Sequence, residues 1–131
     1  MNVLALLIDR EDSQAALDWA VDYTRTVGAT LHVVTAAHDT PAAPGYVSPL
    51  YLDELQGQLD STGVPVVLHE PAQDPARQVL ELIDTLPAEL AVVGLRKRSV
   101  TAKLVLGSHA QDVMLHAGCP VVTVKNQPEA A

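Results

Sequence analysis

The 131-residue chain contains no phenylalanine, a single cysteine and only eight basic residues, against sixteen acidic ones. Without phenylalanine, the core must be built from valine, leucine, alanine and isoleucine. One cysteine, Cys119, excludes an intramolecular disulfide framework and fits a reducing compartment. The apolar runs are far shorter than the roughly 20 residues of a membrane span. Residues 9–12 are charged and interrupt the only N-terminal run that could resemble a signal peptide. We therefore expect a cytoplasmic protein without a membrane partner.

The formal net charge of -8 at pH 7 also argues against a nucleic-acid partner, which requires an extended basic surface. With 48% apolar and 18% charged residues, the composition is that of a globular protein and not of a disordered one. The length predicts one domain over residues 1–126, followed by a disordered tail at 127–131.

Apolar runs alternate with amphipathic segments along the chain. Strands are predicted at 3–8, 30–36, 64–69, 90–94 and 120–124. Helices are predicted to start at Asp12 or Ser13, at Ser48–Pro49, at Asp74–Pro75 and at Ser108 as the N-cap. In the last helix, Ala110, Val113, Met114 and Ala117 are expected to face the core. This order predicts an α/β, Rossmann-like fold with a five-stranded, parallel, doubly wound sheet and four helices.

The segment from Gly94 to Ser108 carries the clearest functional pattern. It follows the apolar strand 90–94, and it ends in Gly107-Ser108 at a predicted helix start. Four of the eight basic residues lie in it: Arg96, Lys97, Arg98 and Lys103. Unpaired amides at a helix N-terminus attract anions, and small residues let the backbone approach a phosphate. We expect one small anionic ligand at this position.

The strand ends predict where the rest of that ligand would lie. With strand order 3-2-1-4-5, strands one and four flank the point where the order reverses, and ligands bind beyond the carboxyl ends there. Asp9 at the end of strand one could accept hydrogen bonds from an adenine amino group or a ribose hydroxyl. Strand two ends near Ala36, whose backbone could meet a base edge. Gly94 and the helix start at Gly107-Ser108 would take the phosphates.

These features, in this order, resemble the universal stress protein family, which has an adenine nucleotide α-hydrolase-like fold. The family motif is Gly, two residues, Gly, nine residues, Gly and then Ser or Thr. Here Gly94, Lys97, Gly107 and Ser108 occupy the four motif positions. Residues 74–77 and 118–124 add to the likeness, which covers nearly the whole chain. The resemblance implies a cytoplasmic, usually dimeric stress protein without established catalytic residues. It also implies that ATP or AMP is bound, and Mg²⁺ could accompany the nucleotide.

Carried over by position, the resemblance places adenosine contacts at Asp9 and at the backbone of Ala36. Further contacts would come from strand four, the basic segment and the last helix start. The predicted nucleotide site comprises Asp9, Ala36, Val93, Gly94, Arg96, Lys97, Arg98, Gly107, Ser108 and His109. No catalytic or metal-ligating residue is predicted. The apolar edge formed by Val121, Val122, Thr123 and Val124 is expected to pair with its two-fold mate in a homodimer.

Two departures from the family pattern keep alternatives open. Lys97 replaces the second motif glycine, and Arg10 and Glu11 replace the small residues that commonly follow the strand-one aspartate. One alternative is a dimeric interaction module of the same fold whose crevice is closed by Glu11 and Lys97.

The sequence gives less support to an enzymatic or phosphoryl-accepting function. A slow ATPase or phosphotransferase would need metal ligands, for which only Asp9, Glu11 and Asp12 are near. A P-loop motif is absent. A response-regulator receiver would need an aspartate at the end of strand three, where this chain has His69-Glu70-Pro71.

Overall fold

The computed structural model of the chain describes residues 1–8, 10–37, 49–97, 104–105 and 107–125. Strands and helices alternate along these residues. In chain order they are β1 (Asn2–Leu7), α1 (Arg10–Val27), β2 (Thr30–Thr35), α2 (Pro49–Asp60), β3 (Val66–Leu68), α3 (Pro75–Thr85), β4 (Leu90–Lys97), β5 (Leu104–Val105), α4 (Ser108–His116) and β6 (Val121–Lys125). The predicted α/β class is confirmed. The proposed tail, 127–131, lies outside the described residues.

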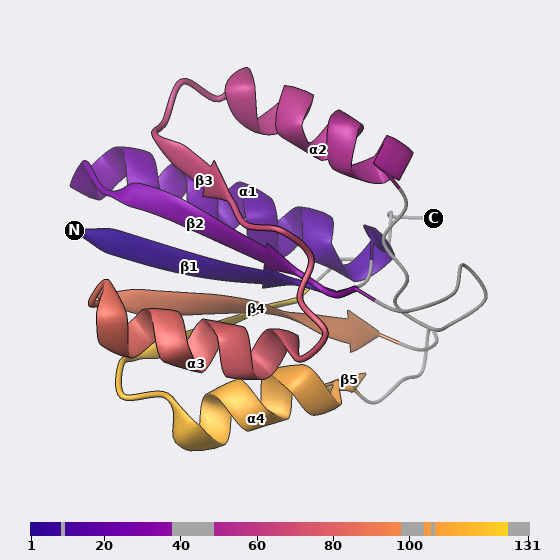
Figure 1. Ribbon diagram of the computed structural model, residues 1–131, viewed down its shortest axis with the longest axis vertical. Helices are drawn as coiled ribbons and strands as arrows, with labels where there is room; N and C mark the ends of the chain where they lie inside the picture. The colour runs from indigo at the N-terminus through magenta and orange to yellow at the C-terminus, as the bar shows by residue number, and fades with distance from the viewer. Residues whose placement is uncertain (9, 38–48, 98–103, 106, 126–131) are drawn as a thin grey trace.

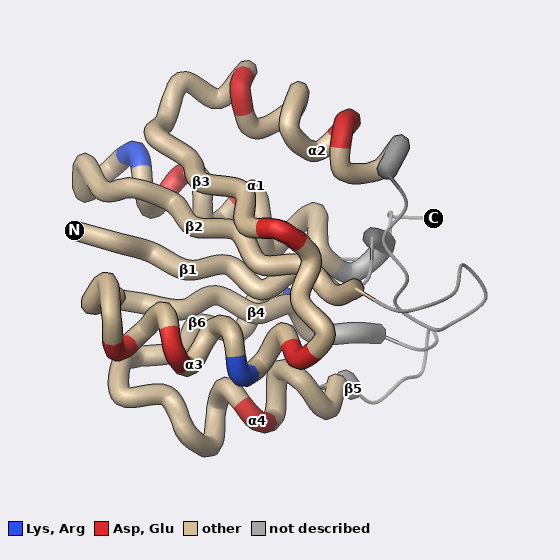
Figure 2. The backbone as a smooth tube through the Cα atoms, in the orientation of Figure 1, with Lys and Arg blue, Asp and Glu red and all other residues tan. Residues whose placement is uncertain are grey.

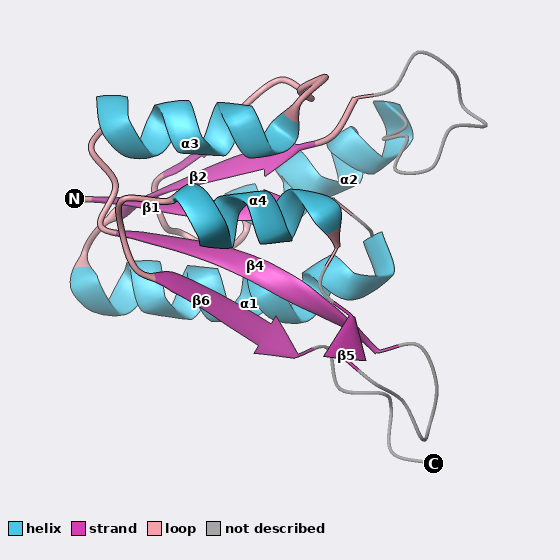
Figure 3. Ribbon diagram, turned by 90° about the horizontal axis from the view of Figure 1, so that it is seen from below, coloured by secondary structure: helices cyan, strands magenta, loops and turns pink. Residues whose placement is uncertain are grey.

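The parallel strands follow the spatial order β3-β2-β1-β4-β6, which is the predicted order 3-2-1-4-5 with β6 as the fifth parallel strand. Figure 1 shows β3, β2, β1 and β4, and Figure 3 shows β6 beside β4. Leu6 of β1 lies between Val34 of β2 and Val93 of β4. From β1 the chain builds outward through β2 to β3, and then crosses by α3 to β4 on the other side. The strand order therefore reverses between β1 and β4.

Two apolar layers hold the sheet between its helices. One packs α1 and α2 on one face through side chains such as Leu17, Leu55 and Leu31. The other packs α3 and α4 on the opposite face through Val79, Val113 and their neighbours. Figure 3 shows α3 and α4 on one side of the sheet and α1 on the other. The largest fully buried side chains are leucines and valines, as a sequence without phenylalanine requires.

Helix α1 begins at Arg10, so the predicted start at Asp12 or Ser13 is wrong. Both are capping residue types, but here they lie within the first turns, and Ser13 is buried. The helix ends as predicted before Gly28, whose φ of +69° suits a residue without a Cβ. Half-buried Trp19 packs against the core and stacks on Tyr23, with ring centroids 5.2 Å apart.

Helix α3 starts as predicted. The Asp74 side chain caps it by accepting a hydrogen bond from the Arg77 amide over 3.2 Å, and Pro75 follows at the first helical position. Helix α4 differs from the prediction. Its N-cap is Gly107 rather than Ser108, and Met114 is 46% exposed rather than facing the core. The nine-residue helix buries only Ala110 and Val113, because one narrow stripe contacts the sheet.

No helix among the described residues has the length and apolar character that crossing a membrane requires.

Candidate functional site

The candidate site is the carboxyl edge of the sheet at β1 and β4, where the strand order reverses. Parallel pairing of β1 with both β2 and β4 brings the three carboxyl ends to one edge. The N-terminus of α4 lies at this same edge (Figure 1). In a doubly wound sheet this is where a ligand would be expected.

Strand β4 is longer than predicted. It runs through Lys97, so the predicted end at Gly94 is wrong. Gly94 is half-buried within the strand and lies in register with Val124 of β6. Beyond it, Arg96 and Lys97 pair with Val105 and Leu104 of β5 in a short antiparallel ladder that the sequence pattern did not predict. The ladder satisfies main-chain groups that a basic, loop-like composition would leave to solvent.

This extension changes the expected phosphate loop. The first residues of that expected loop, Arg96 and Lys97, instead belong to β4 and pair with β5. No described residue other than glycine has a positive φ. Lys97 therefore stands at the second motif position without the backbone strain that a glycine-specific conformation would impose. Arg98 lies outside the described residues, as does the rest of 98–103.

Two residues separate the end of β5 from the start of helix α4. Its N-cap, Gly107, has φ -63° and ψ 159° and offers no side-chain cap, and both Gly107 and Ser108 are exposed. The first helical hydrogen bond runs from the Gln111 amide to the Gly107 carbonyl over 2.9 Å. The amides of residues 108–110 thus have no partner within the helix. His109 is half-buried in this first turn.

The end of β2 contributes main-chain groups to this edge of the sheet. Ala36 is buried and forms a bridge with Ala72, in which Ala72 donates to the Thr35 carbonyl and Ala37 donates to the Ala72 carbonyl. Since backbone groups alternate sides along a strand, the amide and carbonyl of Ala36 point toward the β1 side. This is the side of the strand-order reversal.

The other predicted site residues divide into two groups. Val93 is only 1% exposed, and its main chain lies between β1 and β6 within the sheet, so it underlies the edge without offering an exposed group. Asp9 lies outside the described residues, as do the side chains of Arg10, Glu11, Arg96 and Lys97. Among the described residues, no three histidine, cysteine or carboxylate side chains lie close enough to hold a metal ion.

The acidic residues are not concentrated at this edge of the sheet. Each of the four helices that the structure describes carries acidic residues, so the negative charge is spread over the molecule (Figure 2). Half of the basic residues of the chain, in contrast, fall between Gly94 and Ser108.

Comparison with known proteins decides the family. The profile of the universal stress protein family matches residues 1–125. A universal stress protein from Mycolicibacterium smegmatis (strain ATCC 700084 / mc(2)155) is 30% identical over 118 residues, which cover 86% of this chain and 88% of that protein. The chain belongs to the universal stress protein family.

Solved structures agree with this assignment. The universal stress protein from Archaeoglobus fulgidus superposes with a TM-score of 0.68 at 26% identity, covering 95% of this chain and 97% of that one. A structure of the universal stress protein from Archaeoglobus fulgidus in complex with dAMP gives a TM-score of 0.60 at 22% identity, covering 95% of this chain and 96% of the other.

In this universal stress protein, one polar feature went unnoticed in the sequence. His32 of β2 is 7% exposed, and its Nδ1 lies 3.0 Å from Nε2 of His69, which directly follows β3. Burial, and for His32 also the neighbouring His69, lowers the pKa of both imidazoles. A histidine within an apolar strand, matched by one at the end of a neighbouring strand, is the signal that could have revealed the pair.

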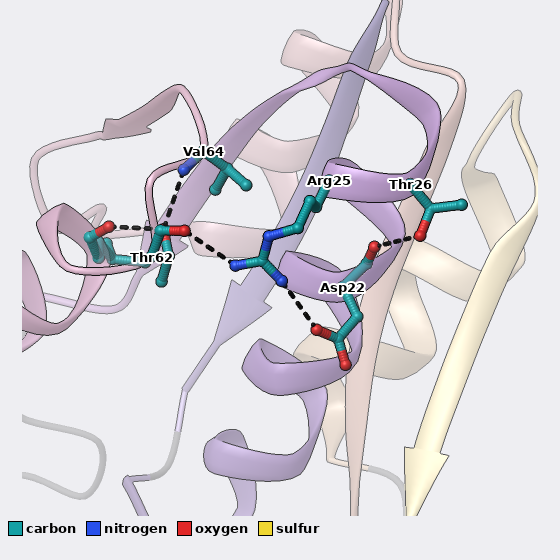
Figure 4. A network of polar contacts seen from close by, with 6 residues as sticks. Asp22, Arg25, Thr26, Thr62 and Val64 are labelled. Atoms are coloured by element: carbon teal, nitrogen blue, oxygen red, sulfur yellow. Dashed lines mark hydrogen bonds and ion pairs between the residues drawn. The ribbon is translucent and has the colours of Figure 1, made fainter.

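A concavity lies between α1 and the end of α2. It encloses about 330 Å³ and is lined by Leu17, Asp18, Val21, Asp22, Arg25, Gln58 and Thr62. Arg25 joins its two walls: the guanidinium donates to the Thr62 carbonyl over 2.8 Å and pairs with Asp22 over 3.2 Å (Figure 4). The Arg25 charge is thus matched within the protein, and the contacts link α1 to the end of α2.

Proposed function

We propose that this universal stress protein binds an adenine nucleotide, ATP or AMP, at the carboxyl edge between β1 and β4. The observation that carries the proposal is the exposed start of α4 beside the end of β4. There Gly107 leaves the first-turn amides without a side-chain cap. A helix start of this kind favours a phosphate through its amides and its dipole.

The neighbouring helix provides a useful contrast. The start of α3 is capped by the Asp74 carboxylate, which would repel a phosphate. The start of α4 has no carboxylate cap and follows the basic segment 96–103. Charge and backbone therefore favour an anion at α4 rather than at α3.

The base would lie at the end of β2. The backbone of Ala36 points toward the strand-order reversal and could bond an adenine edge, while Asp9 would contact the adenosine. The dAMP complex of the Archaeoglobus fulgidus protein supports this ligand class for the family fold. Mg²⁺ could accompany ATP. We infer a cytoplasmic protein that signals or protects under stress without catalysing a reaction.

Strand β6 supports a homodimer. One side of β6 pairs with β4, and in the described part of the chain no strand covers its other side. Val121, Val122 and Val124 are half-buried in the single chain. An antiparallel β6 from a second copy would satisfy the open edge.

One observation favours the alternative, a dimeric interaction module that holds no nucleotide. Lys97 is paired with Leu104 in the β4–β5 ladder at the place where the family motif has its second glycine. A ladder at this position leaves less backbone free to surround phosphates than an open glycine loop would.

Calorimetric titration separates the two functions. Nucleotide-stripped protein is titrated with ATP and with AMP, and mass spectrometry identifies any small molecule released from freshly purified protein. Stoichiometric adenylate and measurable heat support the proposal. Absence of both, at nucleotide concentrations up to the high micromolar range, supports the interaction module. Phosphate release from Mg-ATP would instead indicate an enzyme.

A further inference from the structure

A row of three polar side chains crosses the sheet on the face that α3 covers. Asn2 of β1, His32 of β2 and His69 after β3 are linked in sequence by hydrogen bonds. Asn2 Oδ1 lies 3.1 Å from His32 Nε2, and His32 Nδ1 lies 3.0 Å from His69 Nε2. The Asn2 amide group also donates to the Pro87 carbonyl over 3.4 Å.

The hydrogen bonds of this row determine which nitrogen of each imidazole ring carries a hydrogen. Because the Asn2 oxygen only accepts, His32 Nε2 must carry a hydrogen. Neutral His32 then has a bare Nδ1, which accepts from Nε2–H of His69. A first proton can be accommodated: His32 becomes the donor at both nitrogens, and His69 changes to its Nδ1–H tautomer. A second proton places two N–H groups face to face at 3.0 Å, and the contact is lost.

Carboxylates lie near the row, but in the described part of the chain none is bonded to either ring to offset this second charge. The ionisable groups on the segments next to the row are the Met1 amino group, Glu70 after His69, Glu89, whose amide donates to the Asn2 carbonyl, and Arg77, Glu81 and Asp84 on α3, which packs on β1 and β2. Arg77 and Glu81 pair with each other. Within the described residues, neither ring is hydrogen-bonded to a carboxylate.

The His32–His69 pair lies at the start of residues 69–72, a segment that continues the edge of the sheet beyond β3. The amide of His69 donates to the Val33 carbonyl over 3.0 Å, and Ala72 then exchanges hydrogen bonds with Thr35 and Ala37. Beyond β3, which has three residues, the segment 69–72 is the outermost part of the sheet on this side. Val67 of β3, beside it, is 42% exposed, and within the segment 69–72 only Ala72 packs against the apolar core, so few side-chain contacts oppose separation.

We propose that the His32–His69 contact is an acid-sensitive latch: it holds the segment 69–72 on β2 while at most one of the two rings is positively charged, and it releases that segment when both rings are positively charged. The latch acts on the sheet edge that ends at Ala36, and it requires no bound nucleotide.

The first test uses the unmodified protein. Nitrogen-15 NMR at pH 7.5 should show His32 as the Nε2–H tautomer and His69 likewise, with His69 switching to Nδ1–H as the first proton binds. Hydrogen exchange, corrected for its intrinsic pH dependence, should show the protection of the Ala72 amide falling at least tenfold between pH 7.5 and 5.0. The Val92 amide in the central sheet should stay within twofold.

The second test removes one titrating ring and keeps its hydrogen bond. His69→Gln retains an Nε2 donor toward His32 Nδ1, and the control His116→Gln removes an exposed histidine on α4. The pH-dependent loss of Ala72 protection should shrink below twofold in His69→Gln and persist in His116→Gln. A wild-type loss in His69→Gln, or His32 found as the Nδ1–H tautomer at pH 7.5, would overturn the latch. The tautomer measurement decides even if His69→Gln does not fold.

Discussion

Lys97 of β4 lies directly opposite Leu104 of β5 in an antiparallel pair of strands. This pairing occupies the position where the universal stress protein motif has a glycine. The chain thus keeps the first and last parts of the motif, Gly94 and Gly107-Ser108, and replaces the middle with a short ladder carrying basic residues. If the site holds a nucleotide, positively charged side chains must replace part of the backbone contact with phosphate that the missing glycine would allow.

The charge of Lys97 can be removed with little change of shape. In Lys97→Met, ATP affinity should fall roughly tenfold, about 1.4 kcal/mol, and AMP affinity should fall less because AMP carries fewer phosphates. Lys125→Met, on β6, is the matched control and should bind both nucleotides as before. Calorimetric titration at two salt concentrations measures the effect. Equal losses for ATP and AMP would contradict a phosphate-directed role.

Substitution of Gly107 separates helix stability from anion binding. A Cβ at this position would meet nothing within 4 Å, so a side chain fits. Gly107→Asp should stabilise the fold by a few tenths of a kcal/mol as a better N-cap. The same carboxylate should reduce nucleotide affinity at least tenfold by repelling phosphate. Gly107→Asn provides a cap without charge and should weaken binding less. Unaltered nucleotide affinity in Gly107→Asp would place the phosphates elsewhere.

The proposed dimer can be broken without disturbing the sheet. The Pro120 carbonyl accepts from Ala91 of β4, so by alternation the amide of Thr123 points to the open edge. Thr123→Pro removes that outward donor and should yield monomers in light scattering, with an unchanged far-ultraviolet circular dichroism spectrum. Val122→Pro removes a donor facing β4 and should destabilise the fold itself. A dimer that survives Thr123→Pro must use another surface.

The cap of α3 gives a direct measure of local stability. Asp74→Ala deletes the acceptor of the Arg77 amide and should cost about 1 kcal/mol of unfolding free energy. The melting temperature should fall by about 4 °C for a domain of this size. Asp112→Ala on the exposed surface of α4 is the control, and its melting temperature should change little. Similar shifts in the two variants would show that the cap bond contributes nothing specific.

The histidine pair also predicts a pH dependence of global stability. Because burial lowers the pKa of His32 and His69, the folded protein binds fewer protons than the unfolded chain just below pH 6.5. The stabilisation is therefore present above about pH 6.5 and is lost as the pH falls through the lowered pKa values. Urea unfolding at pH 7.5 and 5.0 should show a smaller decrease in His69→Gln than in the wild type or in His116→Gln.

The sequence predicted the fold because its signals were local and periodic. The continuous apolar run of β1, the Asp74-Pro75 start of α3 and the glycines that end α1 and α2 each agree with the structure. Alternation of strands and helices then restricts the topology to very few arrangements. The position of the candidate site followed from that topology and from Gly107-Ser108.

What the sequence did not predict depends on partners distant along the chain. Strand β5 exists only because Leu104 and Val105 meet the end of β4. The exposure of Met114 depends on how α4 lies on the sheet, since its spacing alone fits an inward position. His32 and His69 are 37 residues apart and meet only when β2 and β3 pair. None of these features can be predicted from the local structural propensities of the residues.

The ring stack of Trp19 on Tyr23 has a practical consequence for experiments. The chain has one tryptophan, so its intrinsic fluorescence reports on a single helix on one side of the sheet. Emission changes during denaturation would follow the departure of that helix from β1 and β4, whereas a ligand arriving near Gly107 would be spectroscopically silent in this channel. A fluorophore on Ser108→Cys, in a Cys119→Ser background, would be the appropriate sensor there.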